Sequence, residues 1–380
     1  MTEKRGDVRA SFIFSMVGGM IAYYIGASTG TGQEFFQTYS SHGTIGVVGV
    51  IIQHILLAAL AILIIRTCKR YNLSNAKECF TWFLGKYVGP VVYYYTVAFV
   101  FCTMVQLISG TGHLLKQYYD WPYYIGASLL AVLCIMSVLF GFKKVIDIIS
   151  KIAPLILLVM AVVFVVGLID PVDGLAQGSA IASSAEEIVK THSSWIGSTI
   201  LHHTYLILFV IPYYVSCYMF DPSASKRETY LWVILSYVLL AAVIILMVLS
   251  QIANMSVVMG KAAPNLAIAT AHAPILAAIL TLMIIAASFT TTAPIAVICA
   301  EYFAKAGTAK YKAIGTVIVL LAFTVSFAGS YAQIINILVT VSGRVGLGVY
   351  IFAACYRGYR MIADKKEPAE LAADTTASCE

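Results

Sequence analysis

The feature that most constrains this chain is the recurrence of apolar runs of about 20 residues, separated by short segments that carry most of the charge. A helix of about 20 apolar residues can cross the ~30 Å hydrocarbon core of a bilayer. Only 11% of the 380 residues are charged and 60% are hydrophobic, which excludes an ordinary soluble domain. The sequence therefore predicts an all-α polytopic membrane protein, because a helix satisfies its backbone hydrogen bonds within one segment.

We predict about ten transmembrane helices from these runs. Their approximate bounds are 11–40, 43–66, 89–115, 122–141, 146–168, 195–220, 229–253, 273–303, 313–328 and 331–356. If the N-terminus is cytoplasmic, twenty lysines and arginines lie in or beside cytoplasmic segments, and only Lys116, Lys190 and Lys261 lie outside. Cytoplasmic loops carry such an excess, and one missed helix would scramble it. We therefore expect a multi-pass protein of the cell (inner) membrane with both termini cytoplasmic.

The ten helices divide into two groups of five. The expected organisation is a cytoplasmic N-terminus (1–10), a first repeat (11–168), an external loop (169–194), a second repeat (195–356) and a cytoplasmic tail (357–380). The fifth helix begins with "VIDII" and the tenth with the similar "IINIL". Because these two helices enter from opposite sides, the groups would form an inverted repeat, an architecture of secondary transporters. We also expect a short interfacial helix at 75–87, a partial helix at 184–191 and a disordered tail from 362.

Polar residues and glycines interrupt the first apolar run, in the stretch "YYIGASTGTGQEFF". They are Gly26, Ser28, Thr29, Gly30, Thr31, Gly32, Gln33 and Glu34. Irregular backbone at membrane depth must line a cavity or be buried in protein. If 26–32 unwinds, its carbonyls can hold a cation, and the amides that begin the second half-helix can attract an anionic group. The alternative is that Gly26 and Gly30 form a GxxxG helix-packing motif.

The sixth helix is expected to carry the matching break. Pro212 removes a backbone donor and clashes with the preceding turn, which predicts a kink or opening around 206–213. Tyr205 and Tyr213 would then line the cavity with the residues of the first helix, although tyrosines near membrane helices also serve as packing or interfacial anchors. We interpret the neighbouring histidines, His202 and His203, as ordinary polar packing.

The eighth helix contains "AASFTTTAPIAV", with four hydroxyls in five residues. Hydroxyls in membrane helices usually bond back to their own helix. They could instead supply hard oxygen ligands to a sodium ion beside the carbonyls of the first helix.

Two charges lie deep in predicted helices, Glu34 and Arg344, and each needs compensation at that depth. They could form a gate pair with one another. Alternatively, Glu34 caps its own half-helix while Arg344 binds a substrate carboxylate with its planar fork. A packing ion pair or a snorkelling arginine would be the purely structural alternative for Arg344.

These motifs resemble the leucine-transporter fold of the amino acid, polyamine and organocation superfamily, over roughly residues 10–356. The glycine pattern before Gln33 is most similar to that of YkvI-like membrane proteins. The resemblance implies that carbonyls of Gly26 and Thr29 hold sodium together with Thr290 and Thr291. It also implies a second sodium site at Gln33 and Ser28, as in some relatives. Glu34 and Arg344 do not reproduce the family's usual gate pair.

We therefore expect a secondary active symporter, coupled to sodium, for a small zwitterionic or polar organic solute such as an amino acid. The substrate-binding residues would be Gly26, Ser28, Gly30, Thr31, Gly32, Gln33, Tyr205 and Tyr213. The alternatives are proton coupling through Glu34 or a histidine, or a channel or receptor-like membrane protein. We expect no enzymatic activity, no cofactor besides the coupling ion and no nucleic-acid partner. The expected partners are the solute and membrane lipid, and the oligomeric state stays open.

Overall fold

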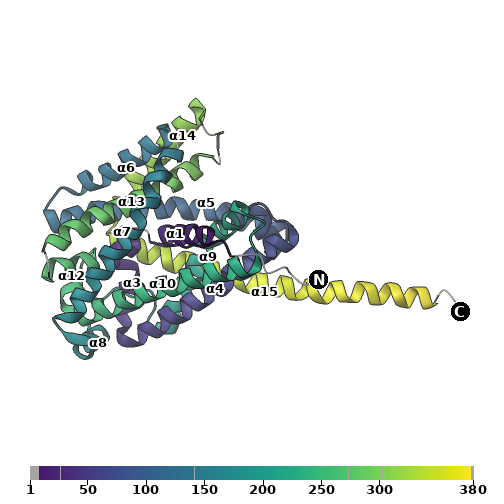
Figure 1. Ribbon diagram of the computed structural model, residues 1–380, viewed down its shortest axis with the longest axis horizontal. Helices are drawn as coiled ribbons and strands as arrows, with labels where there is room; N and C mark the ends of the chain where they lie inside the picture. Colours follow the sequence, from purple (N-terminus) through teal and green to yellow (C-terminus); the bar gives the residue numbers. More distant parts are fainter. Residues whose placement is uncertain are drawn as a thin grey trace.

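The computed structural model describes residues 8–25, 27–140, 142–272, 274–301, 303–305 and 307–377, without the side chains of 27–28, 140, 142–154, 301 and 362–377. Every regular element in that part of the chain is a helix (Figure 1). The elements are α1 (Ala10–Tyr24), α2 (Ala27–Thr31), α3 (Gln33–Thr38), η1 (Ser40–Ile45), α4 (Gly46–Tyr71), α5 (Ala76–Tyr119), α6 (Tyr123–Phe140), α7 (Phe142–Ile169), α8 (Gly174–Ser184), α9 (Trp195–Phe220), α10 (Lys226–Ala253), α11 (Met255–Val258), α12 (Pro264–His272), α13 (Pro274–Glu301), α14 (Ala309–Val325) and α15 (Tyr331–Ala377).

Six helices of the described chain are long and apolar enough to cross a membrane, judged by length and composition. They are Ser40–Tyr71, Ala76–Tyr119, Trp195–Phe220, Lys226–Ala253, Pro274–Ala300 and Tyr331–Met361. The end of α7 and α8 pass the same test together but are bent by 98°. Helices lie in all ten predicted membrane segments, which confirms the all-α polytopic fold class. The count of ten crossings and the inverted repeat stay predictions.

Helix ends follow local sequence signals. Ser225 begins α10 with a capping box, in which its hydroxyl accepts from the Glu228 amide while the Glu228 carboxylate accepts from the Ser225 amide. Gly85, at φ 80°, separates a first short helix of α5 from the long remainder. A short helix before the third predicted membrane segment is therefore confirmed, and its position is set by the glycine.

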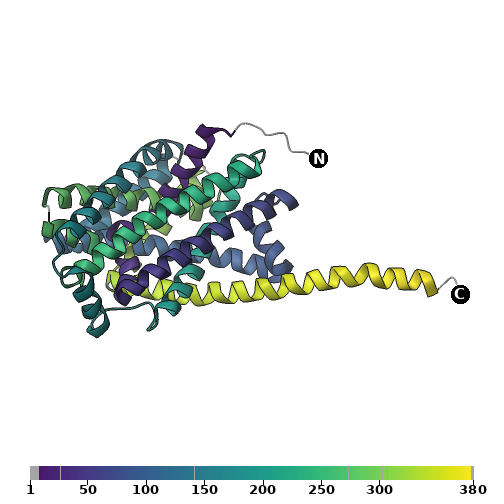
Figure 2. The same cartoon turned by 60° about the horizontal axis from the view of Figure 1, so that its bottom comes forward.

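The helices form one bundle, with the start of α1 and the C-terminal part of α15 toward the same end (Figures 1 and 2). α9 packs against both α15 and α4. The α9–α15 contact is close because α15 presents glycines: a Cβ added at Gly343 would lie 2.5 Å from the Leu201 carbonyl oxygen, and one at Gly346 would lie 1.9 Å from that of Thr204.

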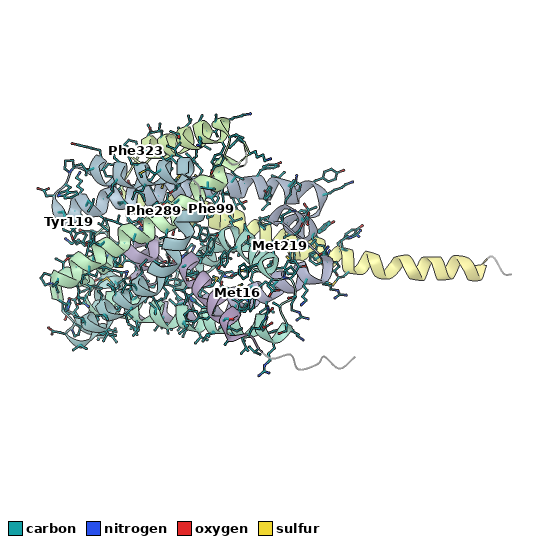
Figure 3. All side chains as sticks on the ribbon, turned by 45° about the horizontal axis from the view of Figure 1, so that its top comes forward. Met16, Phe99, Tyr119, Met219, Phe289 and Phe323 are labelled. Atoms are coloured by element: carbon teal, nitrogen blue, oxygen red, sulfur yellow. The ribbon has the colours of Figure 1, made fainter. Side chains whose placement is uncertain are left out.

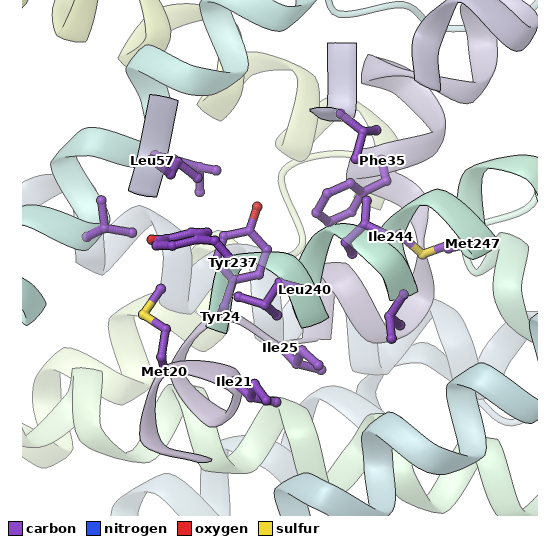
Figure 4. Packing of buried hydrophobic residues seen from close by; sticks show 14 of the residues in the cluster. Met20, Ile21, Tyr24, Ile25, Phe35, Leu57, Tyr237, Leu240, Ile244 and Met247 are labelled. Atoms are coloured by element: carbon purple, nitrogen blue, oxygen red, sulfur yellow. The ribbon is translucent and has the colours of Figure 1, made fainter. Parts of the chain in front are cut away.

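Large apolar side chains remain exposed around the bundle, among them Ile55 and Leu282. Met219 is another, and Figure 3 labels it. A surface of this kind suits lipid rather than water. In the interior, Tyr24 and Phe35, which flank the interruption of the first helix, lie close to Leu240 and Ile244 of α10 (Figure 4).

The structure corrects two predictions about segments outside the bundle centre. The helix in the external loop is α8, at Gly174–Ser184, and 185–194 is not helical, so the partial helix predicted at 184–191 is wrong. The segment 254–272, between the seventh and eighth predicted membrane segments, contains α11 and α12. The tail from 362, predicted to be disordered, continues α15 as a helix to Ala377.

The predicted break in the sixth helix is also wrong, because α9 is one continuous helix from Trp195 to Phe220 with Pro212 inside it. A proline removes one donor and leaves the carbonyl four residues earlier without its helical partner. Next to that position, the Tyr23 hydroxyl donates to the Phe209 carbonyl at 2.7 Å. The loss is confined to one hydrogen bond, and the buried packing of α9 between α4 and α15 keeps the helix intact.

Candidate functional site

The first membrane helix is interrupted, as predicted, but it is not fully unwound. α1 ends at Tyr24, residues 27–31 form the short α2, and Gly32 separates α2 from α3 with φ 79°. A Cβ at Gly32 would lie 2.3 Å from Asn265 Oδ1 and 2.4 Å from Gln251 Nε2, so only glycine fits. Gly26 and the Ser28 side chain lie outside the described part of the chain.

Side-chain amides satisfy the carbonyls that this interruption frees. Asn265 Nδ2 donates to the carbonyls of Thr29 and Gly30, at 3.1 Å each. Gln251 Nε2 donates to the Gly32 carbonyl at 3.2 Å and to Asn265 Oδ1 at 2.8 Å. The Thr29 carbonyl, predicted as a sodium ligand, thus already accepts a hydrogen bond from protein.

Glu34 lies in the first turn of α3 and contacts His202 of α9, 2.6 Å from carboxylate Oε1 to imidazole Nε2. Both side chains are buried, with 4% and 0% of their surface exposed. On the other side of the ring, His202 Nδ1 lies 2.8 Å from Gln53 Oε1 and 3.0 Å from the Tyr39 hydroxyl. Gln53 Nε2 in turn donates to the Tyr24 hydroxyl at 3.3 Å. The chain of contacts joins both halves of the interrupted helix to α4 and α9.

The tautomer of His202 depends on the orientation of the Gln53 amide. With Gln53 Oε1 toward His202 Nδ1 and Gln53 Nε2 toward the Tyr24 hydroxyl, Nδ1 is the donor and carries a proton. One further proton then lies between Nε2 and Glu34, whether as imidazolium with carboxylate or as neutral imidazole with carboxylic acid. In both forms the pair has no net charge, which suits its burial. Losing this proton would leave one buried negative charge and remove the hydrogen bond between α3 and α9.

Four buried oxygens of α3 and α5 have no hydrogen-bond partner in the described part of the chain. They are Gln33 Oε1, Glu34 Oε2, Gln37 Oε1 and Gln106 Oε1. The orientation of Gln37 is set by its Nε2, which donates to the Ala332 carbonyl at 3.0 Å. Buried polar atoms without a partner cost free energy, and here all four are acceptors. A ligand that supplies N–H donors would satisfy them.

A cavity of about 420 Å³ at the end predicted to be external reaches α3 at Gln33 and Phe36. Its lining includes Gln33 from α3, Tyr331 from α15, and charges of both signs: Lys116, Asp120, Glu187 and Lys261. The Tyr331 hydroxyl lies 3.1 Å from the Thr31 hydroxyl. Two of the predicted substrate-binding residues, Thr31 and Gln33, are therefore placed at or beside the cavity.

The two tyrosines of α9 that were predicted to line the cavity, Tyr205 and Tyr213, lie in different surroundings. Tyr205 is buried and stacks on His202, with ring centroids 5.8 Å apart, and it lies within electrostatic range of Glu34. Tyr213 instead stacks on Tyr23 at 4.1 Å. Eight residues separate Tyr213 from Tyr205, which is about 12 Å along a helix. The structure brings Tyr205 to the Glu34 region and places Tyr213 away from it.

The hydroxyls of α13 mostly bond back to their own helix. Ser288 donates to the Ile284 carbonyl, Thr290 to Ala287 and Thr292 to Ser288. Thr291 differs, because its buried hydroxyl has no partner in the described part of the chain. Gly30 packs on Ile284, and Thr291 follows Ile284 by seven residues, so both lie on the face of α13 toward the first helix. Of the predicted pair, Thr290 donates its proton to its own helix and Thr291 has no partner in the described part of the chain, while both hydroxyl oxygens keep lone pairs.

Arg344 and Glu34 do not form the predicted gate pair. Arg344 is exposed and makes no ion pair in the described part of the chain, whereas Glu34 contacts His202. The rotation of α15 explains this. Gly343 and Gly346 must face α9, and the Thr204 hydroxyl donates to the Gly343 carbonyl at 2.6 Å, so residue 344 points out of the bundle.

Ion pairs between side chains hold the opposite end of the first helix, at the start of α1. Arg9 lies 2.6 Å from Asp221 and 2.7 Å from Glu228, which joins the start of α1 to the connection between α9 and α10. The Ser223 hydroxyl and the Arg9 guanidinium hold the pKa of Asp221 below its ordinary value. These ion pairs hold α1 against the start of α10 at the predicted cytoplasmic end, while the mixed-charge cavity lies at the other end.

No protein-family model matches this sequence, and no curated protein matches it. Several solved structures, however, are similar to this chain. A Na⁺-coupled sialic acid symporter in a substrate-bound outward-open state aligns with TM-score 0.59 and 13% identity, over 92% of this chain and 78% of that one. The chain has the leucine-transporter fold.

Two further structures support this fold. A mutant of the manganese transporter of Eremococcus coleocola aligns with TM-score 0.58 and 14% identity, over 93% of this chain and 80% of that one. Mhp1, a nucleobase-cation-symport-1 family transporter, aligns with TM-score 0.53 and 12% identity, over 89% and 78%. All three are transporters rather than enzymes. The similarity to YkvI-like proteins stays a prediction.

Sequence reasoning missed most of the polar residues around the site. They are Gln37, Gln53, Gln106, His202, Gln251 and Asn265, all buried. His202 was interpreted as packing. A usable signal exists, since single amides and histidines inside apolar helices are rare and mark functional positions. Their partners, however, come from distant segments and cannot be read from spacing.

Proposed function

We propose that this protein is a secondary active transporter that moves a small amine-bearing solute and couples its movement to the proton held between Glu34 and His202. The observation that carries the proposal is the buried 2.6 Å contact between the interrupted first helix and α9, surrounded by acceptors without partners. The structural similarity to symporters and other transporters supports the transport class.

The coupling follows from the proton count. With the proton present, α3 is joined to α9 by a charge-assisted or short neutral hydrogen bond, and the buried pair is neutral. Without it, a carboxylate is left in a site with little water, which costs several kcal/mol. The unprotonated state therefore favours an arrangement in which Glu34 is solvated, so protonation biases α3 between two positions.

The solute class follows from the acceptors. Glu34 Oε2 and the amide oxygens of Gln33, Gln37 and Gln106 have no donor among the described residues, and an ammonium group supplies several. The cavity above them carries both signs of charge, which suits a zwitterion such as an amino acid. No cluster of three or more His, Cys, Asp or Glu side chains occurs in the described residues, which favours an organic solute over a divalent cation as cargo.

The test uses purified protein in proteoliposomes. A thermal-shift screen of amino acids, amines and betaines first selects a labelled solute. We expect saturable counterflow of that solute, which a channel or receptor would not give. We also expect uptake in sodium-free buffer that rises when the outside is acidified.

Glu34→Gln and His202→Gln should abolish the response to the pH gradient. The matched control is His203→Gln, because His203 is the adjacent histidine and instead contacts the Tyr350 hydroxyl at 2.9 Å. Uptake by the unmodified protein that ignores the pH gradient would refute proton coupling.

Sodium coupling is the second candidate, and the unpartnered hydroxyl of Thr291 favours it. The carbonyls near the first break and this hydroxyl would be its ligands, together with Thr290 if its hydroxyl turns from its own helix. We expect under this candidate that Thr291→Val raises the sodium concentration needed for uptake, while Thr292→Val, which removes only a bond to Ser288, does not. Uptake that is unchanged by sodium in both variants and in the unmodified protein excludes this candidate.

A further inference from the structure

A second and larger cavity, of about 1270 Å³, lies at the predicted cytoplasmic end, away from the Glu34 region. α9 packs against both α4 and α15, and it supplies Ile207 and Ile211 to the lining. The walls come from α4, from α15 and from the short first helix of α5, with Phe80, Phe83 and Leu84. The result is a groove with a mainly apolar lining, which exceeds the ~300–1,000 Å³ of ordinary small-molecule pockets.

Five cations line the same groove: Arg66, Lys69, Arg70, Lys226 and Arg357. In the described part of the chain none of them forms an ion pair. Arg66 donates to the Tyr230 hydroxyl, Lys69 to the Ala224 carbonyl, and the Arg357 guanidinium lies 3.5 Å from the centre of the Trp82 ring. These neutral partners leave the positive charge uncompensated.

The dimensions of the groove match one leaflet of a membrane. Its α4 wall runs from Ala59 to Tyr71 and its α15 wall from Val349 to Met361. Each stretch is about 18 Å long, slightly more than the ~15 Å of hydrocarbon in one leaflet. The cations of α4 lie in its last turns and Arg357 lies in the second half of the α15 wall, toward the predicted cytoplasmic surface.

We propose that this groove is a binding site for an anionic phospholipid of the cytoplasmic leaflet, with the phosphate among the cations and an acyl chain along α9. Cytoplasmic lysines and arginines are expected from topology alone, but topology does not require an apolar groove between them. Charge complementarity selects an anionic head group, and the length of the apolar walls selects a lipid over free phosphate or a soluble solute. This site is independent of the transport site.

Native mass spectrometry of the purified full chain tests the proposal, by titration with dioleoyl phosphatidylglycerol and with dioleoyl phosphatidylcholine. We expect phosphatidylglycerol to bind at least about tenfold more tightly, since each cation near the surface contributes about fivefold. The triple variant Arg66→Gln, Arg70→Gln, Arg357→Gln should lose at least about tenfold of that affinity. The matched control is Lys305→Gln, Lys310→Gln, Lys312→Gln, which removes the same charge from the same predicted face outside the groove.

A second variant keeps all the cations. Ala59 is exposed in the groove, so Ala59→Trp should fill it and reduce phosphatidylglycerol binding, whereas Ala242→Trp, an exposed position of α10 outside the lining, should not. Fluorescence quenching by phosphatidylglycerol with brominated acyl chains should fall in Trp82→Phe. Equal affinity for the two lipids, or equal losses in the groove variants and their controls, overturns the proposal. The proposal is also overturned if the protein forms a dimer and Ala59→Trp abolishes that dimer without changing the affinity for lipid.

Discussion

The first and sixth predicted membrane helices meet at Glu34 and His202, yet of these two only the first is interrupted. Its break contains a glycine at φ 79°, and the Asn265 amide donates to the carbonyls of Thr29 and Gly30 in place of their helical partners. α9 contains a proline but stays helical for 26 residues. The difference teaches that a buried helix opens where the surrounding protein supplies new hydrogen-bond partners, and that the loss of one donor is not sufficient.

Gly32→Val should have the largest effect, because it attacks the interruption itself. The new side chain would clash with Asn265 and Gln251 in a backbone conformation that β-branched residues avoid. We expect a loss of at least about 3 kcal/mol of folding stability and no transport. Thermal unfolding in detergent measures this. Gly18→Ala, where nothing lies within 4 Å of the new Cβ, is the control and should unfold normally.

Removing one member of the Glu34–His202 pair should have the second-largest effect on stability. Glu34→Gln or His202→Gln should each cost about 2–4 kcal/mol, because each disrupts a buried charge-assisted contact. The double variant should cost less than the sum of the two. Additive losses in denaturant unfolding would show that the first and sixth helices are not coupled through this pair.

Arg9→Gln should loosen the other end of the first helix, with a smaller loss of stability than at Glu34, because solvent screens an ion pair at the surface. Hydrogen exchange in the first turns of α1 should become faster. The pKa of Asp221 is lowered, so its contribution is complete above its ordinary pKa of 3.8 and is lost as the pH falls below that value. The difference between variant and unmodified protein should therefore be constant from about pH 6 to 8 and shrink below about pH 4. A difference that grows on acidification would argue against this role.

Pro212→Ala should change the stability of the protein by less than about 1 kcal/mol, since α9 already has helical geometry there. Transport should be retained. If transport is lost while the unfolding temperature is unchanged, α9 opens during the transport cycle, and the contrast between the two helices holds only for the state seen here.

Arg344→Leu should have the smallest effect on transport, because Arg344 is exposed and apart from Glu34. Transport within about twofold of the unmodified protein is expected in the same proteoliposome assay, as for a surface position away from a site. If Arg344→Leu severely reduces transport although the variant reaches the membrane at a normal level, Arg344 acts in the transport pathway.

The sequence by itself determined the all-helical membrane fold and the place where the first helix is interrupted. Both depend on local chemistry: apolar runs of spanning length, and Gly32 among polar residues where lipid would otherwise be. Only the tertiary structure decided the partner of Glu34, which lies 168 residues away in α9, and the continuity of α9 through Pro212.

The orientation of each helix about its axis was also outside the reach of the sequence. Gly343 and Gly346 must fit against α9, and this close contact turns Arg344 outward and away from Glu34. The rotation of α13 likewise distinguishes the adjacent residues Thr290 and Thr291. The Thr291 hydroxyl is buried without a partner in the described part of the chain, whereas the Thr290 hydroxyl donates to its own helix. Local sequence sets where helices form, but the packing of distant segments decides which side chains meet.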